Sequence, residues 1–248
     1  MSAFLGLSQF PPALIVAVFA ASLLQSVTGI GFGVIAGPLL LASVGSASAI
    51  QASIVLSLLI AVILAPGTLR LVSGSLLRPV FLGICIGTPV GGILFMILSI
   101  DALKTLAAIT VGTMTVIASG VLSRYPVFEI DTPRRRMAAG AISGVLNTTL
   151  AMPGPPIAAY ATAIRSDKAI IRATTLVAFL LAYPIAFGMQ HLVAGISADL
   201  WAIAAPLSLP TIAGVLAGSA IARHVNEQAF KWLTVGFLLA SVTALVVS

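Results

Sequence analysis

Two short groups of uncharged polar residues stand directly before glycine- or proline-rich interruptions of apolar sequence. The first group is Gln25, Ser26 and Thr28, and the glycines of Gly29-Ile30-Gly31-Phe32-Gly33 follow it. The second group is Asn147, Thr148 and Thr149, followed by Met152-Pro153-Gly154-Pro155-Pro156. Amides and hydroxyls donate hydrogen bonds without carrying charge. A helix that restarts after an interruption presents free N–H groups and a positive dipole end. Together these features are typical of an anion-binding site.

The charged residues agree with an anionic rather than a cationic ligand. Arg172 stands near the start of a predicted helix, with Thr174 and Thr175 after it, and can supply positive charge. Every acidic residue falls in a loop or at a helix end, so no carboxylate is predicted inside the membrane as a cation site or proton relay. These residues are Asp101, Glu129, Asp131, Asp167, Asp199 and Glu227. The pattern argues against a cation antiporter.

Structural explanations compete with the functional one at each of these positions. Glycines in membrane helices allow close packing, which favours a packing role for Gly83, Gly87 and Gly91 and for Gly214 and Gly218. The Asn147 group can instead form interhelical hydrogen bonds. Arg172 can extend its side chain to the membrane interface. The sequence leaves these alternatives open at the two interruptions and at Arg172.

The elements that must position these residues are membrane-spanning helices. The chain has 248 residues, of which 60% are hydrophobic and only 7% are charged. A soluble domain of this size cannot hide so much apolar surface. We therefore predict an all-α, polytopic transmembrane helical bundle. Apolar segments are predicted at about 11–29, 30–44, 46–65, 78–98, 101–122, 137–150, 154–164, 168–190, 198–222 and 225–247.

Two pairs of these segments are too long for one straight helix and too short for two full spans. They are 11–44 and 137–164, and each is interrupted by glycine or proline near its middle. We interpret each pair as a helical hairpin whose ends return to the same side. With the N-terminus outside, this arrangement places nearly all arginine and lysine residues on the cytoplasmic side, as the positive-inside rule requires. The C-terminus is then also outside. One straight crossing for each pair would scatter the arginines over both sides.

The two halves of the chain resemble each other. Residues 36–40 match 153–157, and residues 49–53 match 170–174. Each half is predicted to contain one broken hairpin and three spanning helices. Because the hairpins enter from opposite sides, the halves are predicted to be inverted repeats, at 1–123 and 137–248, joined by a cytoplasmic linker at 124–136. Interrupted helices at corresponding positions of such repeats indicate a transporter's substrate site.

Several other classes lack support in the sequence. The net charge of +6 is spread over short loops, so we expect no nucleic-acid partner. We expect no metal, no nucleotide-binding motif, no cofactor and no catalytic triad, and hence no enzyme. Cys85, the single cysteine, lies in an apolar run and is expected to be a packing residue. The N-terminus lacks the positive region of a cleaved signal peptide.

At these residues the chain resembles the TauE/SafE family of sulfite and organosulfur-anion exporters. The resemblance rests on Gln25 through Gly33 leading to Gly37-Pro38-Leu39-Leu40, and on Gly140-x3-Gly144 leading to Gly154-Pro155-Pro156, with Arg172-Ala173-Thr174 after them. It covers almost the whole chain. Family members typically carry a Gly-x-Gly-Gly-Pro type interruption in the second half. Met152-Pro153-Gly154-Pro155 stands there instead, so the resemblance does not fix the substrate.

The resemblance implies a secondary carrier of the bacterial plasma membrane that exports sulfite, thiosulfate, a sulfonate or a related small anion. We expect the anion near the membrane midplane, between the two interruptions, in an alternating-access carrier. An anion channel that uses the same hairpins is the alternative, and a membrane enzyme or assembly factor is a weaker one. The sequence leaves open whether the chain forms a homo-oligomer. The predicted substrate-binding residues are Gln25, Ser26, Thr28, Gly29, Gly31, Gly33, Asn147, Thr148, Thr149, Gly154 and Arg172.

Overall fold

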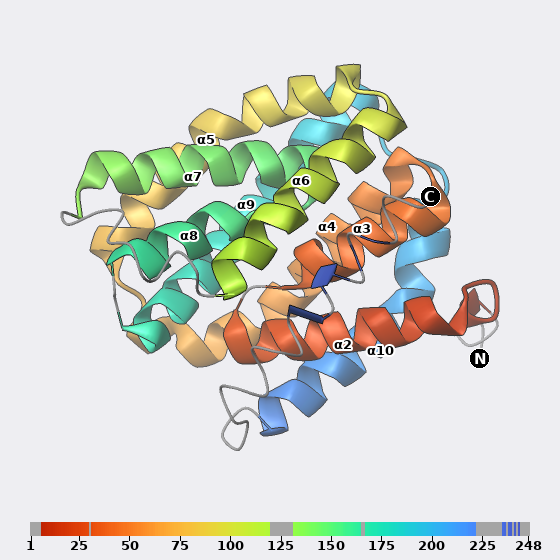
Figure 1. Ribbon diagram of the computed structural model, residues 1–248, viewed down its shortest axis with the longest axis horizontal. Coiled ribbons are helices and arrows are strands. Elements are labelled where there is room, and N and C mark those ends of the chain that lie inside the picture. Colours follow the sequence, from red (N-terminus) through yellow and green to blue (C-terminus); the bar gives the residue numbers. More distant parts are fainter. Residues whose placement is uncertain are drawn as a thin grey trace.

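The helices of this chain pack around a buried centre, where α2 (Pro12–Thr28) is followed by α3 (Phe32–Val44), and α7 (Pro133–Leu150) by α8 (Gly154–Ile164), after a short interruption (Figure 1). The computed structural model describes residues 6–29, 31–119, 131–164 and 167–221, together with residues 235, 236, 238, 239, 241 and 243. All regular secondary structure within these residues is helical. The last predicted span, 225–247, lies outside the described residues except at these six positions. Of the predicted linker at 124–136, only residues 131–136 are described.

The helix order follows the apolar segments of the sequence closely. The first half contains α2 (Pro12–Thr28), α3 (Phe32–Val44), α4 (Ala47–Leu64), a 3-10 helix η1 (Ala65–Leu71), α5 (Gly74–Ile97) and α6 (Ile100–Ser119). The second half contains α7 (Pro133–Leu150), α8 (Gly154–Ile164), α9 (Lys168–Ala194) and α10 (Leu200–Ile221). Within the described residues, five helices are long and apolar enough to cross a membrane: 47–71, 74–97, 100–117, 169–194 and 200–221.

The two predicted hairpins are present, each as a pair of short helices. Helix α2 runs inward and α3 returns to the side from which α2 started, and α7 and α8 do the same (Figure 1). In this view α2 begins at the right of the molecule and α7 begins at the left.

Helices of one half pack on the hairpin of the other half. Helix α5 lies along α7, and α10 lies along α2, with α3, α4 and α9 between these two pairs (Figure 1). The α5–α7 contact is close because glycines face backbone carbonyls across it. A Cβ atom built on Gly87 would lie 2.0 Å from the carbonyl oxygen of Ala141, and one on Gly144 would lie 2.3 Å from that of Ile84. The predicted packing role of these glycine rows is confirmed.

Helices α3 and α4 carry much of the core. Phe32, Ile35 and Leu40 on α3 are buried, as are Ile54 and Ile60 on α4. Helix α6 lies at the periphery, with Ile109 and Val116 exposed. An exposed apolar side chain is expected on a helix surrounded by lipid. The interruptions of α2–α3 and α7–α8 therefore lie inside the protein, where membrane-depth backbone can be satisfied.

Candidate functional site

The first interruption begins with a left-handed helix cap. Helix α2 ends at Gly29, whose φ of 83° is a conformation that glycine adopts readily, and the Gly29 N–H donates to the Gln25 carbonyl at 2.7 Å. Helix α3 then starts at Phe32. The Phe32 N–H donates to Oε1 of Gln25 at 2.8 Å, so the side chain that precedes the interruption caps the helix that follows it. The predicted N–H donor at this helix start is therefore already bound by the protein.

The second interruption is built in the same way with different residues. Helix α7 ends at Ala151, which has a φ of 60°, and its N–H donates to the Asn147 carbonyl at 2.8 Å. The bond from Ala151 is that of an αL cap, and the Met152 N–H donates to the Leu146 carbonyl at 3.2 Å. Helix α8 starts at Gly154, and Pro155 and Pro156 have no N–H, so this start offers fewer donors than an ordinary helix N-terminus.

The two interruptions touch each other at the centre of the bundle. A Cβ atom on Gly33 would lie 2.1 Å from the carbonyl oxygen of Ala151, which only glycine permits. One turn later, a Cβ atom on Gly37 would lie 3.6 Å from Cε of Met152. Ser143 supports the second interruption from α7, because its Oγ donates to the Pro153 carbonyl at 2.6 Å. The structure thus brings Gly33 to the partner hairpin, as the sequence predicted for opposed breaks.

Most predicted hydroxyl ligands donate to backbone carbonyls. The hydroxyls of Ser26 and Thr28 donate to Leu23 and Leu24, and that of Thr148 donates to Gly144. The Thr149 hydroxyl donates to the Gly91 carbonyl of α5 at 3.0 Å. Helix hydroxyls commonly bond the preceding turn in this way. In the structure each of these four hydroxyls has a backbone acceptor, and their role as ligands stays a prediction.

Arg172 lies at the first interruption. Its guanidinium donates to the Ser26 carbonyl at the end of α2. A Cβ atom built on Gly29 would lie 2.9 Å from Cγ of Arg172. The positive charge therefore faces the carbonyl end of α2, which is a favourable place for a cation. Arg172 thus ties α9 to the first hairpin.

Several buried amide and hydroxyl atoms near the interruptions have no hydrogen-bond partner among the described residues. Asn147 donates from Nδ2 to the Ala182 carbonyl at 3.2 Å, which leaves its Oδ1 unpaired. Gln190 donates to the Thr148 carbonyl at 2.6 Å, which leaves its Oε1 unpaired. At the first interruption the unpaired atoms are Nε2 of Gln25 and Oγ of Ser57, together with the Nε of Arg172. Nearly all buried polar groups in proteins are paired, so this set is exceptional and makes the region the candidate site.

Sequence reasoning missed Ser57, Tyr183 and Gln190. The Tyr183 hydroxyl neighbours the side chains of Ser57 and Gln25, and its ring packs on Phe179 with centroids 5.8 Å apart. Tyr183 stands before Pro184, which suggested only a helix kink. The usable signal was the presence of polar residues inside the spans that follow the hairpins: Ser57 on α4, and Tyr183 and Gln190 on α9.

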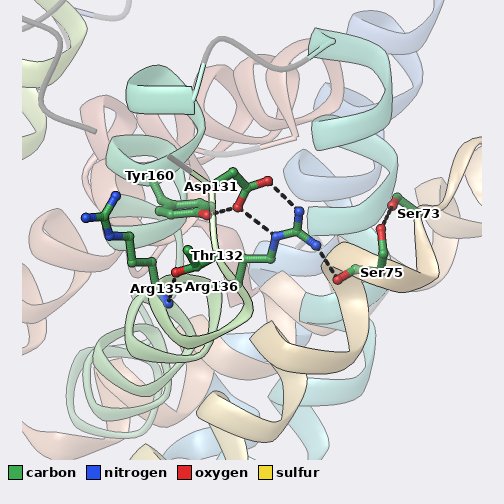
Figure 2. Close-up of polar contacts among 7 residues, drawn as sticks. All are labelled: Ser73, Ser75, Asp131, Thr132, Arg135, Arg136 and Tyr160. Atoms are coloured by element: carbon green, nitrogen blue, oxygen red, sulfur yellow. Dashed lines mark hydrogen bonds and ion pairs between the residues drawn. The ribbon is translucent and has the colours of Figure 1, made fainter. Parts of the chain in front are cut away.

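A second polar network closes the opposite end of the second hairpin (Figure 2). Arg136 pairs with Asp131 through two hydrogen bonds, and its third donor reaches the Ser75 carbonyl of α5 at 2.6 Å. The Tyr160 hydroxyl of α8 donates to the same Asp131 carboxylate. The hydrogen bond from Arg136 holds the pKa of Asp131 below its ordinary value of 3.8. This network joins α5, α7 and α8 at their outer ends.

The fold and the site are those of a transporter-type membrane protein. Interrupted helices that meet inside a multi-pass bundle are typical of secondary transporters. The chain matches the family described as sulfite exporter TauE/SafE over residues 14–245, and it therefore belongs to that family. Membership makes it a membrane transporter-type protein with an anionic substrate. No curated protein and no solved structure matched the chain.

Proposed function

We propose that this protein is an alternating-access carrier that exports a small sulfur-containing anion, such as sulfite, thiosulfate or a sulfonate. The observation that carries the proposal is the direct contact of the two hairpin interruptions, Gly33 against Ala151, inside a bundle of a sulfite-exporter family. Both α3 and α8 begin at this contact, so two positive helix ends face the same region. The anion binds there, near the membrane midplane.

We further propose that residues 1–123 and 137–248 form two inverted repeats joined by the linker 124–136. The reciprocal packing of α5 on α7 and of α10 on α2 supports this relation. The two hairpins also correspond at one position. The backbone carbonyls of Gln25 and Asn147, both residues with amide side chains, each accept the N–H of the left-handed cap residue of their helix. Movement of one repeat against the other then exposes the site to each side in turn.

The charges of the described residues support an outward-moving anion. The carboxylates of Asp101, Asp131, Asp167 and Asp199 are exposed, so no described acidic group competes with an anion in the interior. A monovalent anion that leaves a cell with a negative interior gains about 2.3 kcal/mol for each 100 mV of membrane potential. The potential alone can therefore drive export from the bacterial plasma membrane, with both termini outside.

The proposal is tested by counterflow of labelled sulfite, thiosulfate and methanesulfonate in liposomes that contain only the purified protein. Saturable counterflow supports the carrier. Conductance far above carrier turnover would instead identify an anion channel. Absence of any flux would refute transport by this chain alone, as expected of an enzyme or an assembly factor.

A matched pair of variants tests the position of the site. Asn147→Asp replaces a buried amide with a carboxylate of the same size between the interruptions, where it repels an anion. Gln9→Glu makes the same change at an exposed residue whose amide donates to the Ala202 carbonyl. We expect at least a tenfold loss of counterflow, about 1.4 kcal/mol, for the first variant only. Equal activity of the two variants would remove Asn147 from the site.

A further inference from the structure

Three polar side chains from three helices meet beside the first interruption. Gln25 comes from the last turn of α2, Ser57 from α4 and Tyr183 from α9. Their exposed fractions are 1%, 0% and 1%, so the group is buried inside the protein. The Tyr183 hydroxyl lies beside the other two side chains. The group combines residues from both halves of the chain.

The orientation of the Gln25 amide is fixed by the backbone. Its Oε1 accepts the Phe32 N–H at 2.8 Å, and only the oxygen of an amide can accept a hydrogen bond. The Nε2 atom must therefore occupy the other position, where the Tyr183 hydroxyl lies beside the side chain but Nε2 forms no hydrogen bond of acceptable geometry. Ser57 Oγ also lacks a partner. Two N–H groups of the amide and the hydroxyl of Ser57 are thus buried as unused donors, which is costly unless something accepts them.

The surroundings define what can accept these hydrogen bonds. No carboxylate of the described residues is buried. Arg172 lies at the same interruption, where one terminal nitrogen donates to the Ser26 carbonyl and the buried Nε has no partner. Gln25, Ser57 and Tyr183 themselves are neutral donors, and the charge of Arg172 is held against the carbonyl end of α2. Neutral donors stabilise an anion through charge-assisted hydrogen bonds. They do not neutralise its charge.

Because Gln25, Ser57 and Tyr183 carry no charge, the charge of the anion decides how well they can bind it. The cost of moving an ion from water into a protein interior rises with the square of its charge, so a divalent anion costs about four times as much as a monovalent one. A few neutral hydrogen bonds offset the smaller cost far better than the larger one. Building on the carrier function proposed above, we propose that Gln25, Ser57 and Tyr183 bind the transported anion and select singly charged oxyanions over doubly charged ones.

Sulfite itself tests the charge preference, because hydrogen sulfite loses its proton near neutral pH while its size hardly changes. Initial rates of uptake are measured at about pH 6 and about pH 8, where ordinary carboxylates and tyrosines do not titrate. We expect the KM for total sulfite to rise several-fold at the higher pH as the monovalent form disappears. Methanesulfonate, which is monovalent throughout, should inhibit uptake equally at both values, and sulfate should inhibit weakly.

Three outcomes of this experiment would overturn the charge preference. The first is a KM for sulfite that is constant or falls as the pH rises. The second is inhibition by methanesulfonate that disappears at the higher pH, because this would assign the titration to the protein. The third is strong inhibition by sulfate.

Removal of single hydroxyls tests the residues. Tyr183→Phe keeps the ring that packs on Phe179, and Ser57→Ala removes only the unpaired oxygen. Each should raise the KM about tenfold, as expected for loss of a hydrogen bond to a charged group, without lowering the melting temperature. Ser53→Ala is the matched control, since this buried serine lies one turn earlier on α4 and donates to the Ala49 carbonyl. Its KM should stay unchanged.

The results separate this inference from the carrier function. An unchanged KM in both hydroxyl variants, with normal counterflow by the unmodified protein, would refute the role of these residues and leave the carrier intact. Absence of counterflow with every sulfur anion would refute the carrier itself. A direct readout is the rise in melting temperature of the purified protein with methanesulfonate, which Tyr183→Phe should abolish at the same concentration.

Discussion

Substitution of Gly33 by alanine should destabilise the contact between the two hairpins. The new Cβ would lie 2.1 Å from the Ala151 carbonyl oxygen, whereas ordinary contact begins at 3.4 Å. This oxygen cannot turn away easily, because Ala151 and Met152 are held by hydrogen bonds of 2.8 and 3.2 Å to the end of α7. One hairpin must therefore move by about 1 Å, and overpacking of this kind costs about 1–3 kcal/mol.

A glycine without neighbours provides the reference for this measurement. Gly188 lies on α9 with no atom within 4 Å of an added Cβ, so Gly188→Ala should gain up to about 1 kcal/mol from helix propensity. With a net loss of about 2 kcal/mol, Gly33→Ala should melt about 4–8 °C below the unmodified protein. Melting in lipid nanodiscs, followed by tryptophan fluorescence, measures both variants, and counterflow should fall with Gly33→Ala alone. A Gly33→Ala protein as stable as Gly188→Ala would refute the contact.

Three further perturbations have defined expectations. Gly87→Ala on α5 should cost about 2 kcal/mol, because its Cβ would lie 2.0 Å from the α7 backbone, and should melt below Gly112→Ala, which has open space. Arg172→Leu leaves the Ser26 carbonyl unpaired and should lower stability by about 1–2 kcal/mol in the same assay, whereas a purely interfacial arginine would show no loss. Because hydrogen bonding lowers the pKa of Asp131 in the folded protein, its stabilising effect is present above about pH 3.8 and lost as the pH falls below it. An Asp131→Asn protein should therefore show a weaker acid dependence of its melting temperature.

Helix positions followed from the sequence because their signals are local. The apolar segment predicted at 11–29 is α2, Pro12–Thr28, and the one at 154–164 is α8, Gly154–Ile164. Glycine at a left-handed cap and prolines without N–H groups end helices wherever they fold. The interruptions were therefore predictable from residue type alone. The cap at Ala151 was not, since alanine seldom takes a positive φ.

The side-chain partners depended on packing that no local pattern contains. Thr149 is predicted to bind an anion, and nothing in the sequence indicated that its hydroxyl donates to Gly91, which is 58 residues away. Arg172 was predicted to contribute charge to the site, and its guanidinium caps α2 through Ser26. Tyr183 attracted no functional prediction because its neighbours come from α2 and α4. The sequence thus indicated the region of the candidate site, while the unpaired donors within it emerged only from the three-dimensional arrangement.

The reciprocal packing of the two halves has a consequence for biosynthesis. When the ribosome has released α2 to α6, the polar interruption at Gln25 still lacks Tyr183, and α2 still lacks the α10 surface that covers it. The first hairpin therefore waits in the translocation machinery or in lipid with uncovered polar backbone until the second half arrives. Truncation after α6 should yield a fragment that the cell's quality-control proteases degrade, and co-expression of residues 124–248 should protect it.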